Sequence, residues 1–275
     1  MRKKKFSRIL SYLILVLMSV FVLFPFLWTF LTSVKPQLQM FAIPPVVIPR
    51  PPTLDNYVQV ISAGDFQSFL RNSLVVSIVS SLLAMAIGAP AAYGFAKYRY
   101  RFSGLLFGGI IVVRMFPPII LGIPFFLMMR SLGIIDNDLS LIITYVPLEL
   151  TLIIWLLEGF FRELPKEIEE AADIDGLGTL GKFLRIVVPL SIPAIGVASI
   201  FGFLVAWNEF MFALTLTRTP DSETMPVGIA GYVTTFQTFW GQMSATGMLY
   251  ILPVVLFTIL AQRGLVKGLT SGATK

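Results

Sequence analysis

Six long stretches of this 275-residue chain are almost free of charged side chains, and this feature constrains its fold most strongly. A helix needs about 20 mostly apolar residues to cross a hydrocarbon core of roughly 30 Å. Helices suit that medium because they satisfy their own backbone hydrogen bonds. We therefore predict an all-α membrane protein, treated as one transmembrane domain over 1–275. Its six transmembrane helices are expected over about 9–31, 72–96, 104–129, 139–158, 187–213 and 243–262.

The composition agrees with a membrane protein and excludes several site types. Hydrophobic residues make up 56% of the chain and charged residues 13%, against about 25% charged in soluble domains. The chain has no cysteine and no histidine. Disulfides, Fe–S clusters, the usual zinc sites and Ser-His-Asp triads are therefore excluded. We predict no catalytic residue and no metal site.

Basic residues indicate the orientation in the membrane. The chain begins with a basic cluster over residues 2–8, followed by an apolar stretch longer than the 7–15 residues of a signal-peptide core. We expect an uncleaved first span. Most other lysines and arginines fall in loops on the same side as that cluster, and cytoplasmic loops are the ones enriched in them. Both termini are therefore expected to be cytoplasmic.

One inner loop, about 159–186, has the signals of a short helix at about 165–176. Pro165 suits a first helical position, Glu169 suits the positive N-terminal end, and Gly176 suits the left-handed position after the last turn. Small residues, Ala171 and Ala172, make one side narrow enough for another surface to approach closely. Geometry alone favours a solvated amphipathic connector lying on the membrane.

The residues of this loop also follow a known pattern. Glu170-Ala171-Ala172 with Asp175-Gly176 resembles the EAA loop of ABC-importer permeases. The resemblance implies a type I ABC importer permease fold in which about 165–176 is a cytoplasmic coupling helix that docks into the ATPase subunit. It implies that the ATPase-coupling residues are Glu170, Ala171, Ala172, Asp175 and Gly176.

Other motifs resemble the carbohydrate branch of that family, and the tail over 268–272 resembles the maltose-permease G-subunit type. These motifs include 92–96, 117–118 and 207–210. The resemblance implies a transport subunit rather than an enzyme, for a di- or oligosaccharide or related polyol. It places the chain in a bacterial or archaeal plasma membrane.

The resemblance also implies a set of partners. They are a homologous second permease, an ATPase homodimer or heterodimer, and an extracytoplasmic solute-binding protein that contacts the outer loops 35–71 and 214–242. The lipid bilayer and a sugar substrate complete the set, and no nucleic acid is expected. ATP and Mg²⁺ would be bound by the ATPase partners, and no cofactor by this chain.

One motif is misleading. Residues 176–182 match most of the phosphate-binding pattern G-x-x-x-x-G-K-[ST], but Phe183 stands where a magnesium-binding hydroxyl is required. The segment also follows an expected helix rather than a strand. We therefore do not expect this chain to bind the nucleotide.

Polar residues inside the spans are candidate functional groups. Arg114 and Glu149 are both expected near mid-depth, where charges usually pair or face water, so we predict an intramembrane ion pair or a shared cavity. Trp207, Asn208 and Glu209 supply the stacking and hydrogen-bonding groups that a sugar needs, which makes them a predicted substrate path. Interface anchoring and helix–helix hydrogen bonding explain Trp207 and Asn208 equally well.

Two other classes of function are weighed against the importer. An ion-coupled secondary transporter could use Glu149 or Glu209 as proton carrier, but the chain shows no clear internal repeat of broken spans. An intramembrane enzyme would need a nucleophile and a base, and no convincing constellation of these is present.

Overall fold

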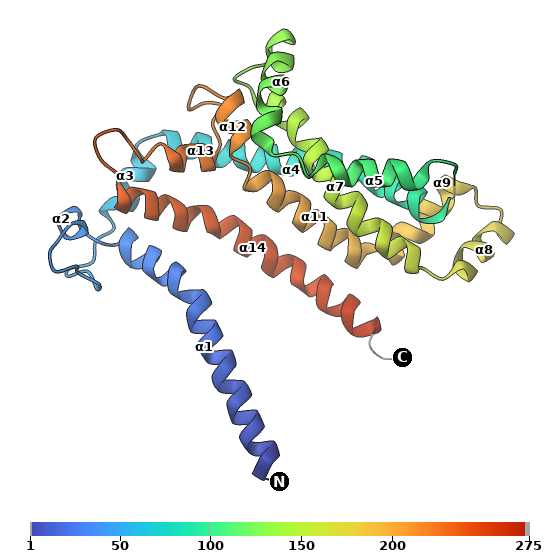
Figure 1. Ribbon diagram of the computed structural model, residues 1–275, viewed down its shortest axis with the longest axis horizontal. Coiled ribbons are helices and arrows are strands. Elements are labelled where there is room, and N and C mark those ends of the chain that lie inside the picture. Colours follow the sequence, from blue (N-terminus) through green and yellow to red (C-terminus); the bar gives the residue numbers. More distant parts are fainter. Residues whose placement is uncertain (1, 99, 273–275) are drawn as a thin grey trace. The chain divides into compact units, whose positions relative to one another are not determined.

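The computed structural model describes residues 2–98 and 100–272, and their regular elements are helices joined by loops, with one isolated bridge between Val233 and Thr238 (Figure 1). The chain forms two units, a division that the hydropathy pattern does not signal. The first unit contains residues 1–67 and 228–252, and the second contains residues 68–227 and 253–275. The two units are described separately below.

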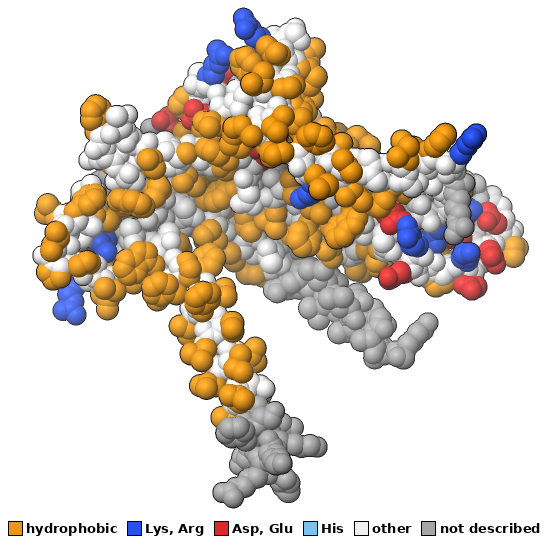
Figure 2. All heavy atoms as spheres, viewed as in Figure 1, with side chains coloured by type: hydrophobic (Ala, Val, Ile, Leu, Met, Phe, Trp, Pro, Cys, Tyr) orange, Lys and Arg blue, Asp and Glu red, His pale blue; other side chains and the backbone are white. Residues whose placement is uncertain are grey.

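The first unit is built around the C-terminal end of α1. Its helices are α1 (Arg2–Ser33), α2 (Gln37–Met40), α3 (Asp55–Ser62) and the first part of α14 (Trp240–Gly272). The buried Asn56 amide donates to the carbonyl oxygens of Ser33 (2.9 Å) and Lys35 (3.0 Å), and this fixes α3 to the end of α1. Apolar side chains of α1 are exposed on all sides, as Figure 2 shows.

The second unit holds most of the helices. Their bounds are α4 (Asp65–Lys97), α5 (Ser103–Val113), α6 (Pro118–Ser131), α7 (Asp138–Glu163), α8 (Lys166–Ile174), α9 (Thr179–Lys182), the π-helical turn η1 (Phe183–Val187), α10 (Val188–Leu190), α11 (Ile192–Trp207), α12 (Met211–Leu216) and α13 (Met225–Ala230).

Four helices are individually long and apolar enough to cross a membrane. These are Ile9–Ser33, Asp65–Lys97, Asp138–Glu163 and Trp240–Ile259. Two further candidates are bent pairs, Ser103–Val113 with Pro118–Ser131 at 95° and Thr179–Leu190 with Ile192–Trp207 at 83°. The count reaches six when each bent pair is one span, and the predicted all-α membrane fold is confirmed.

Prolines account for both bends. Pro117 and Pro118 have no backbone N–H, so the helical hydrogen bonds stop after α5. Pro193 removes another such bond, and the Ser191 N–H turns back to the carbonyl oxygens of Val187 and Val188 at 3.0 and 3.1 Å. The spans expected to be continuous over 104–129 and 187–213 are therefore divided into shorter helices.

Glycines let α4 and α11 approach α7 closely. A Cβ atom at Gly88 would lie 2.8 Å from the Ile153 side chain, and one at Gly202 would lie 3.1 Å from it. Ile153 is fully buried, within the core that α4, α7 and α11 share. Small residues at a helix interface have this effect in membranes, where dispersion contacts carry much of the association.

Replacing Gly88 by valine should therefore lower stability by about 1–3 kcal/mol, because the branched side chain would overlap Ile153 in a filled core. The measurement is the thermal unfolding midpoint of the detergent-solubilised subunit. Gly94→Val is the matched control, since it lies on the same helix with no atom within 4 Å of its Cβ position. Equal shifts for both variants would contradict the packing argument.

Candidate functional site

The predicted coupling segment forms α8, with Pro165 at its N-cap and Gly176 just past its end. Gly176 has a φ of +77°, the left-handed conformation that glycine adopts most easily. Of the five predicted ATPase-coupling residues, only Ala172 is buried. The exposed ones are Glu170, Ala171, Asp175 and Gly176.

The free face of α8 includes one residue that the sequence analysis missed. Ile174 is 88% exposed at the end of the helix, beside Asp175. Charged side chains of both signs surround this end of the unit, over α8 and α9 (Figure 2). An isoleucine on the polar half of so short a helix is the sequence signal that could have identified it.

The opposite side of α8 is attached to the rest of the unit. Lys97 Nζ lies 2.9 Å from Glu169 Oε1, and Lys182 Nζ lies 2.8 Å from Asp173 Oδ1. The Lys97 ammonium also donates to the Leu164 carbonyl oxygen at 3.0 Å. These contacts present the exposed face of α8 outward.

A second candidate site is a cavity of about 450 Å³ between the two broken spans. It is lined by Arg114 at the break after α5, and by Asn208 and Glu209 just past the C-terminal end of α11. The Asn208 amide donates to the Leu204 carbonyl oxygen at 2.8 Å. Glu209 accepts the N–H groups of Phe212 and Ala213 at 3.0–3.1 Å, and so begins α12.

Trp207 does not line this cavity. Its ring is buried, with 1% exposed, and stacks on Phe203 with ring centroids 5.3 Å apart. This corrects the expectation that Trp207 faces the substrate path together with Asn208 and Glu209. The helix ends at Trp207, so the next two side chains leave its packed face and turn toward the cavity.

The predicted ion pair between Arg114 and Glu149 is absent from the ion pairs of the described residues, and this also is a correction. Glu149 is fully buried, and its Oε2 accepts the Ser81 hydroxyl at 2.5 Å. A Cβ atom at Gly202 would lie 3.3 Å from the same oxygen. The carboxyl group thus lies between α4 and α11, whereas Arg114, at the end of α5, lines the cavity between the broken spans.

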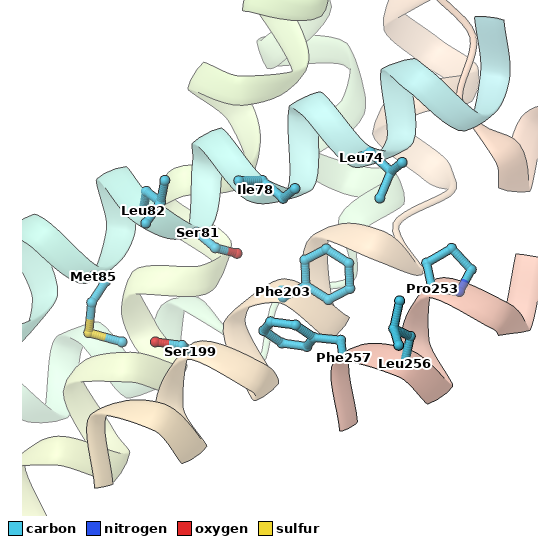
Figure 3. A pocket seen from close by; sticks show the side chains of 10 residues that line it. All are labelled: Leu74, Ile78, Ser81, Leu82, Met85, Ser199, Phe203, Pro253, Leu256 and Phe257. Atoms are coloured by element: carbon cyan, nitrogen blue, oxygen red, sulfur yellow. The ribbon is translucent and has the colours of Figure 1, made fainter. Parts of the chain in front are cut away.

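A third feature is an apolar cavity of about 310 Å³ lined by α4, α11 and α14. Figure 3 shows its wall, which carries two hydroxyl groups, those of Ser81 and Ser199, among aliphatic and aromatic side chains. Because Ser81 is also the donor to Glu149, the buried carboxyl group lies behind this wall. The cavity offers few polar groups to a hydroxylated ligand.

At the far end of α7 from α8, Asp136 joins two loops. Its carboxylate accepts the Arg218 N–H (2.7 Å), the Thr219 N–H (3.1 Å) and hydroxyl (2.9 Å), and the Ser222 hydroxyl. Burial acts to raise the pKa of Asp136, but the hydrogen bonds from Ser222, Arg218 and Thr219 outweigh it and lower that pKa.

A comparison with protein families matches residues 84–270 to the binding-protein-dependent transport system inner membrane component. The chain belongs to this family of transport permeases. It is 36% identical over 275 residues to the inner membrane ABC transporter permease protein YcjP of Escherichia coli, covering 99% of this chain and 98% of the relative. The family is one of transport subunits of the inner membrane, as the sequence predicted.

Two relatives among these permeases have named substrates. The trehalose transport system permease protein SugB of Mycobacterium tuberculosis is 36% identical over 257 residues, or 93% of each chain. The trehalose/maltose transport system permease protein MalG of Thermococcus litoralis is 35% identical over 280 residues, covering 100% of this chain and 99% of the relative.

Solved structures confirm the fold class, a type I ABC importer permease. A bacterial ABC transporter involved in the import of the acidic polysaccharide alginate matches with a TM-score of 0.78 at 20% identity, over 96% of this chain and 98% of the other. The MetNI methionine ABC transporter matches with a TM-score of 0.60 at 15% identity, over 73% and 94%. Likeness at this identity shows the fold and not the substrate.

Replacing Asp136 by asparagine should destabilise the permease by about 1–3 kcal/mol at pH 7, since hydrogen bonds to a charged group are lost. The pKa of Asp136 is lowered in the folded state, so its contribution is present above the unfolded value and disappears as pH falls through the folded value. The difference in unfolding midpoint between wild type and variant should therefore shrink below about pH 4. Asp221→Asn is the control, because this exposed carboxylate lies in the same loop. A pH-independent difference would count against the titration.

Proposed function

We propose that this permease forms half of the translocation pathway of an ATP-driven importer for a di- or oligosaccharide or related polyol. The observation that carries the proposal is the exposed Glu170–Gly176 face of α8, held outward at one end of the unit. Family membership supports the importer, and relatives whose names include trehalose and maltose support the sugar class. The family gives no support to ion coupling, and the Glu149 and Glu209 carboxylates both have structural hydrogen bonds.

In the proposed assembly, this permease and a homologous second permease span the lipid bilayer. An ATPase homodimer or heterodimer and an extracytoplasmic solute-binding protein bind to them from opposite sides. The family description names a binding protein, and one solved relative is an alginate transporter in complex with a pentasaccharide-bound periplasmic protein. ATP and Mg²⁺ belong to the ATPases in this proposal, and the permease carries out no catalysis itself. Residues 176–182 resemble a phosphate-binding loop, but they follow the helix α8 instead of a strand. This supports assigning nucleotide binding to the ATPases.

The proposed orientation places both termini and α8 in the cytoplasm. The outer loops 35–71 and 214–242, where the binding protein would dock, then include Arg218 and Thr219, which bond to Asp136. Closure of the ATPases would move α8, and α8 would move the spans between inward-open and outward-open states. The substrate can shift the equilibrium between these two states only through contacts that differ between them.

We place the substrate path at the cavity of Arg114, Asn208 and Glu209. The break after α5 and the end of α11 both leave helical hydrogen bonds unmade beside it, which is tolerated at membrane depth where the backbone lines a cavity or is buried in protein. Amide, carboxylate and guanidinium groups there can bond to sugar hydroxyls. The apolar cavity of Figure 3 offers only the Ser81 and Ser199 hydroxyls.

The coupling role is tested by co-purification from mild detergent. Gly176→Arg should abolish recovery of the ATPase, because a long charged side chain would occupy the docking face of α8. Gly133→Arg is the matched control, because this glycine also has a positive φ (+71°) and no atom near its Cβ position, but it follows α6. Both substitutions therefore place arginine in a similarly strained backbone conformation. Loss of the ATPase with both variants, or with neither, would contradict the proposed coupling helix.

The substrate path is tested by sugar uptake in reconstituted complexes. Asn208→Ala should weaken apparent substrate affinity roughly 2- to 10-fold, the worth of about one hydrogen bond. Ser199→Ala is the control. Ser199 lies on α11, the helix that ends just before Asn208, and it lines the apolar cavity instead. Weakening by the Ser199 variant alone would transfer the path to the cavity of Figure 3.

A further inference from the structure

The last turn of α4 is attached to the coupling helix by a partly buried ion pair. Lys97, the last residue of α4, lies 2.9 Å from Glu169 on α8, and the two side chains are only 11% and 18% exposed. The same ammonium donates to the Leu164 carbonyl oxygen, just before α8, at 3.0 Å. One lysine therefore holds both the start of α8 and its first turns.

Tyr93, one turn before Lys97, adds a second attachment. Its hydroxyl donates to Glu169 Oε2 at 3.5 Å. Its ring packs against Phe161 at the end of α7 and Phe183 in η1, with ring centroids 6.0 and 5.3 Å apart. Glu169 is thus bound on both oxygens by residues of α4, beside an aromatic cluster that joins α4, α7 and η1.

The Glu169 side chain points toward the rest of the unit, whereas the side chains of its acidic neighbours point toward solvent. Glu167 and Glu170 are exposed, whereas Glu169 is half-buried and lies three residues before the buried Ala172. Residues three apart share a helix face, so Glu169 and Ala172 form the inward side of α8. The outward side keeps Glu170 and Asp175 for a partner.

The setting makes this pair stronger than an exposed one. Surface ion pairs contribute little, because water screens them and long side chains lose freedom. An ion pair shielded from water is screened less, and here the ammonium also donates a hydrogen bond to the Leu164 carbonyl oxygen. The Lys182–Asp173 pair of the same helix is the contrast, since the Asp173 side chain is 59% exposed.

We propose that Lys97, Glu169 and Tyr93 form a latch that transmits movement of the coupling helix directly to α4. The helix α4 continues without a break from Lys97 to Ser81 and Leu74, which line the apolar cavity, and it packs on α7 through Gly88. A displacement of α8 therefore reaches Ser81 and Leu74 along one helix, which includes Pro90 on the way. Glu169 acts as a positioning residue, and the proposal rests on the proposed importer function.

The test uses the assembled complex reconstituted in liposomes, with sugar uptake and ATP hydrolysis measured on the same preparation. Glu169→Gln and Lys97→Met should lower uptake roughly 5- to 100-fold, the range of a typical coupling between sites. ATP hydrolysis and ATPase co-purification should remain, so that hydrolysis is uncoupled from transport. The charge exchange Lys97→Glu with Glu169→Lys should restore uptake at least partly.

The control is Glu167→Gln, the same substitution at an exposed glutamate of the same helix outside 170–176, which should leave uptake within about 2-fold of wild type. Wild-type uptake and wild-type ATP consumption per sugar in Glu169→Gln would overturn the latch. Loss of uptake and hydrolysis together, without recovery in the exchange variant, would also overturn it, because the pair would then be only structural. Retained ATPase binding in Gly176→Arg would instead refute the docking face, so the two failures are distinguishable.

A chemical cross-link supplies a second measurement. The chain contains no cysteine, so Lys97→Cys with Glu169→Cys introduces the only two thiols. A short bismaleimide, which adds one cysteine thiol across each of its two C=C bonds, should restore uptake relative to the unlinked double variant, since a covalent bridge replaces the ion pair. A bridge that forms and leaves uptake unchanged would contradict transmission through this contact.

Discussion

The hydrocarbon core of the membrane imposes the constraint on which this structure depends: each backbone N–H and C=O group at that depth needs a partner. The long helices α4 and α7 satisfy most of these groups, although Pro90 and Pro147 within them lack the N–H of a helical hydrogen bond. At Pro117, Pro118 and Pro193 the helical hydrogen bonds stop and the chain bends sharply. Such backbone is tolerated where it lines a cavity, and the cavity of Arg114, Asn208 and Glu209 borders the break after α5 and the end of α11.

Buried polar contacts position the packed helices around that cavity. Glu149 accepts the Ser81 hydroxyl between α4 and α7, and Gly202 leaves room for the carboxyl group on α11. A hydrogen bond of this kind fixes the rotation of helices whose apolar surfaces would otherwise slide. At the other end of the unit, the Glu169 latch gives α8 a single orientation. The same helix, α4, contributes to both contacts, which is why movement at α8 can reach the membrane interior.

Hydropathy made the apolar helices predictable but not the breaks at Pro117, Pro118 and Pro193, and residue identity made the short helix α8 predictable. The helix α8, its capping residues and its exposed face follow from 163–176, since these signals are local. The partners of the intramembrane charges were not predictable in this way. Arg114 and Glu149 were expected to pair because of equal depth, but depth does not specify the rotation of a helix about its axis. Side-chain direction at the end of a helix likewise separated Trp207 from Asn208 and Glu209.

The sequence by itself determined the all-α membrane class, the family motifs and the position of the coupling helix, because each depends on composition or on residues close together in the chain. Tertiary structure alone decided that Glu149 bonds to Ser81, that Trp207 is buried, and that Lys97 reaches Glu169. Those contacts join residues far apart in sequence. They depend on how closely glycines allow helices to pack and how each helix is rotated, and neither quantity is written in a hydropathy pattern.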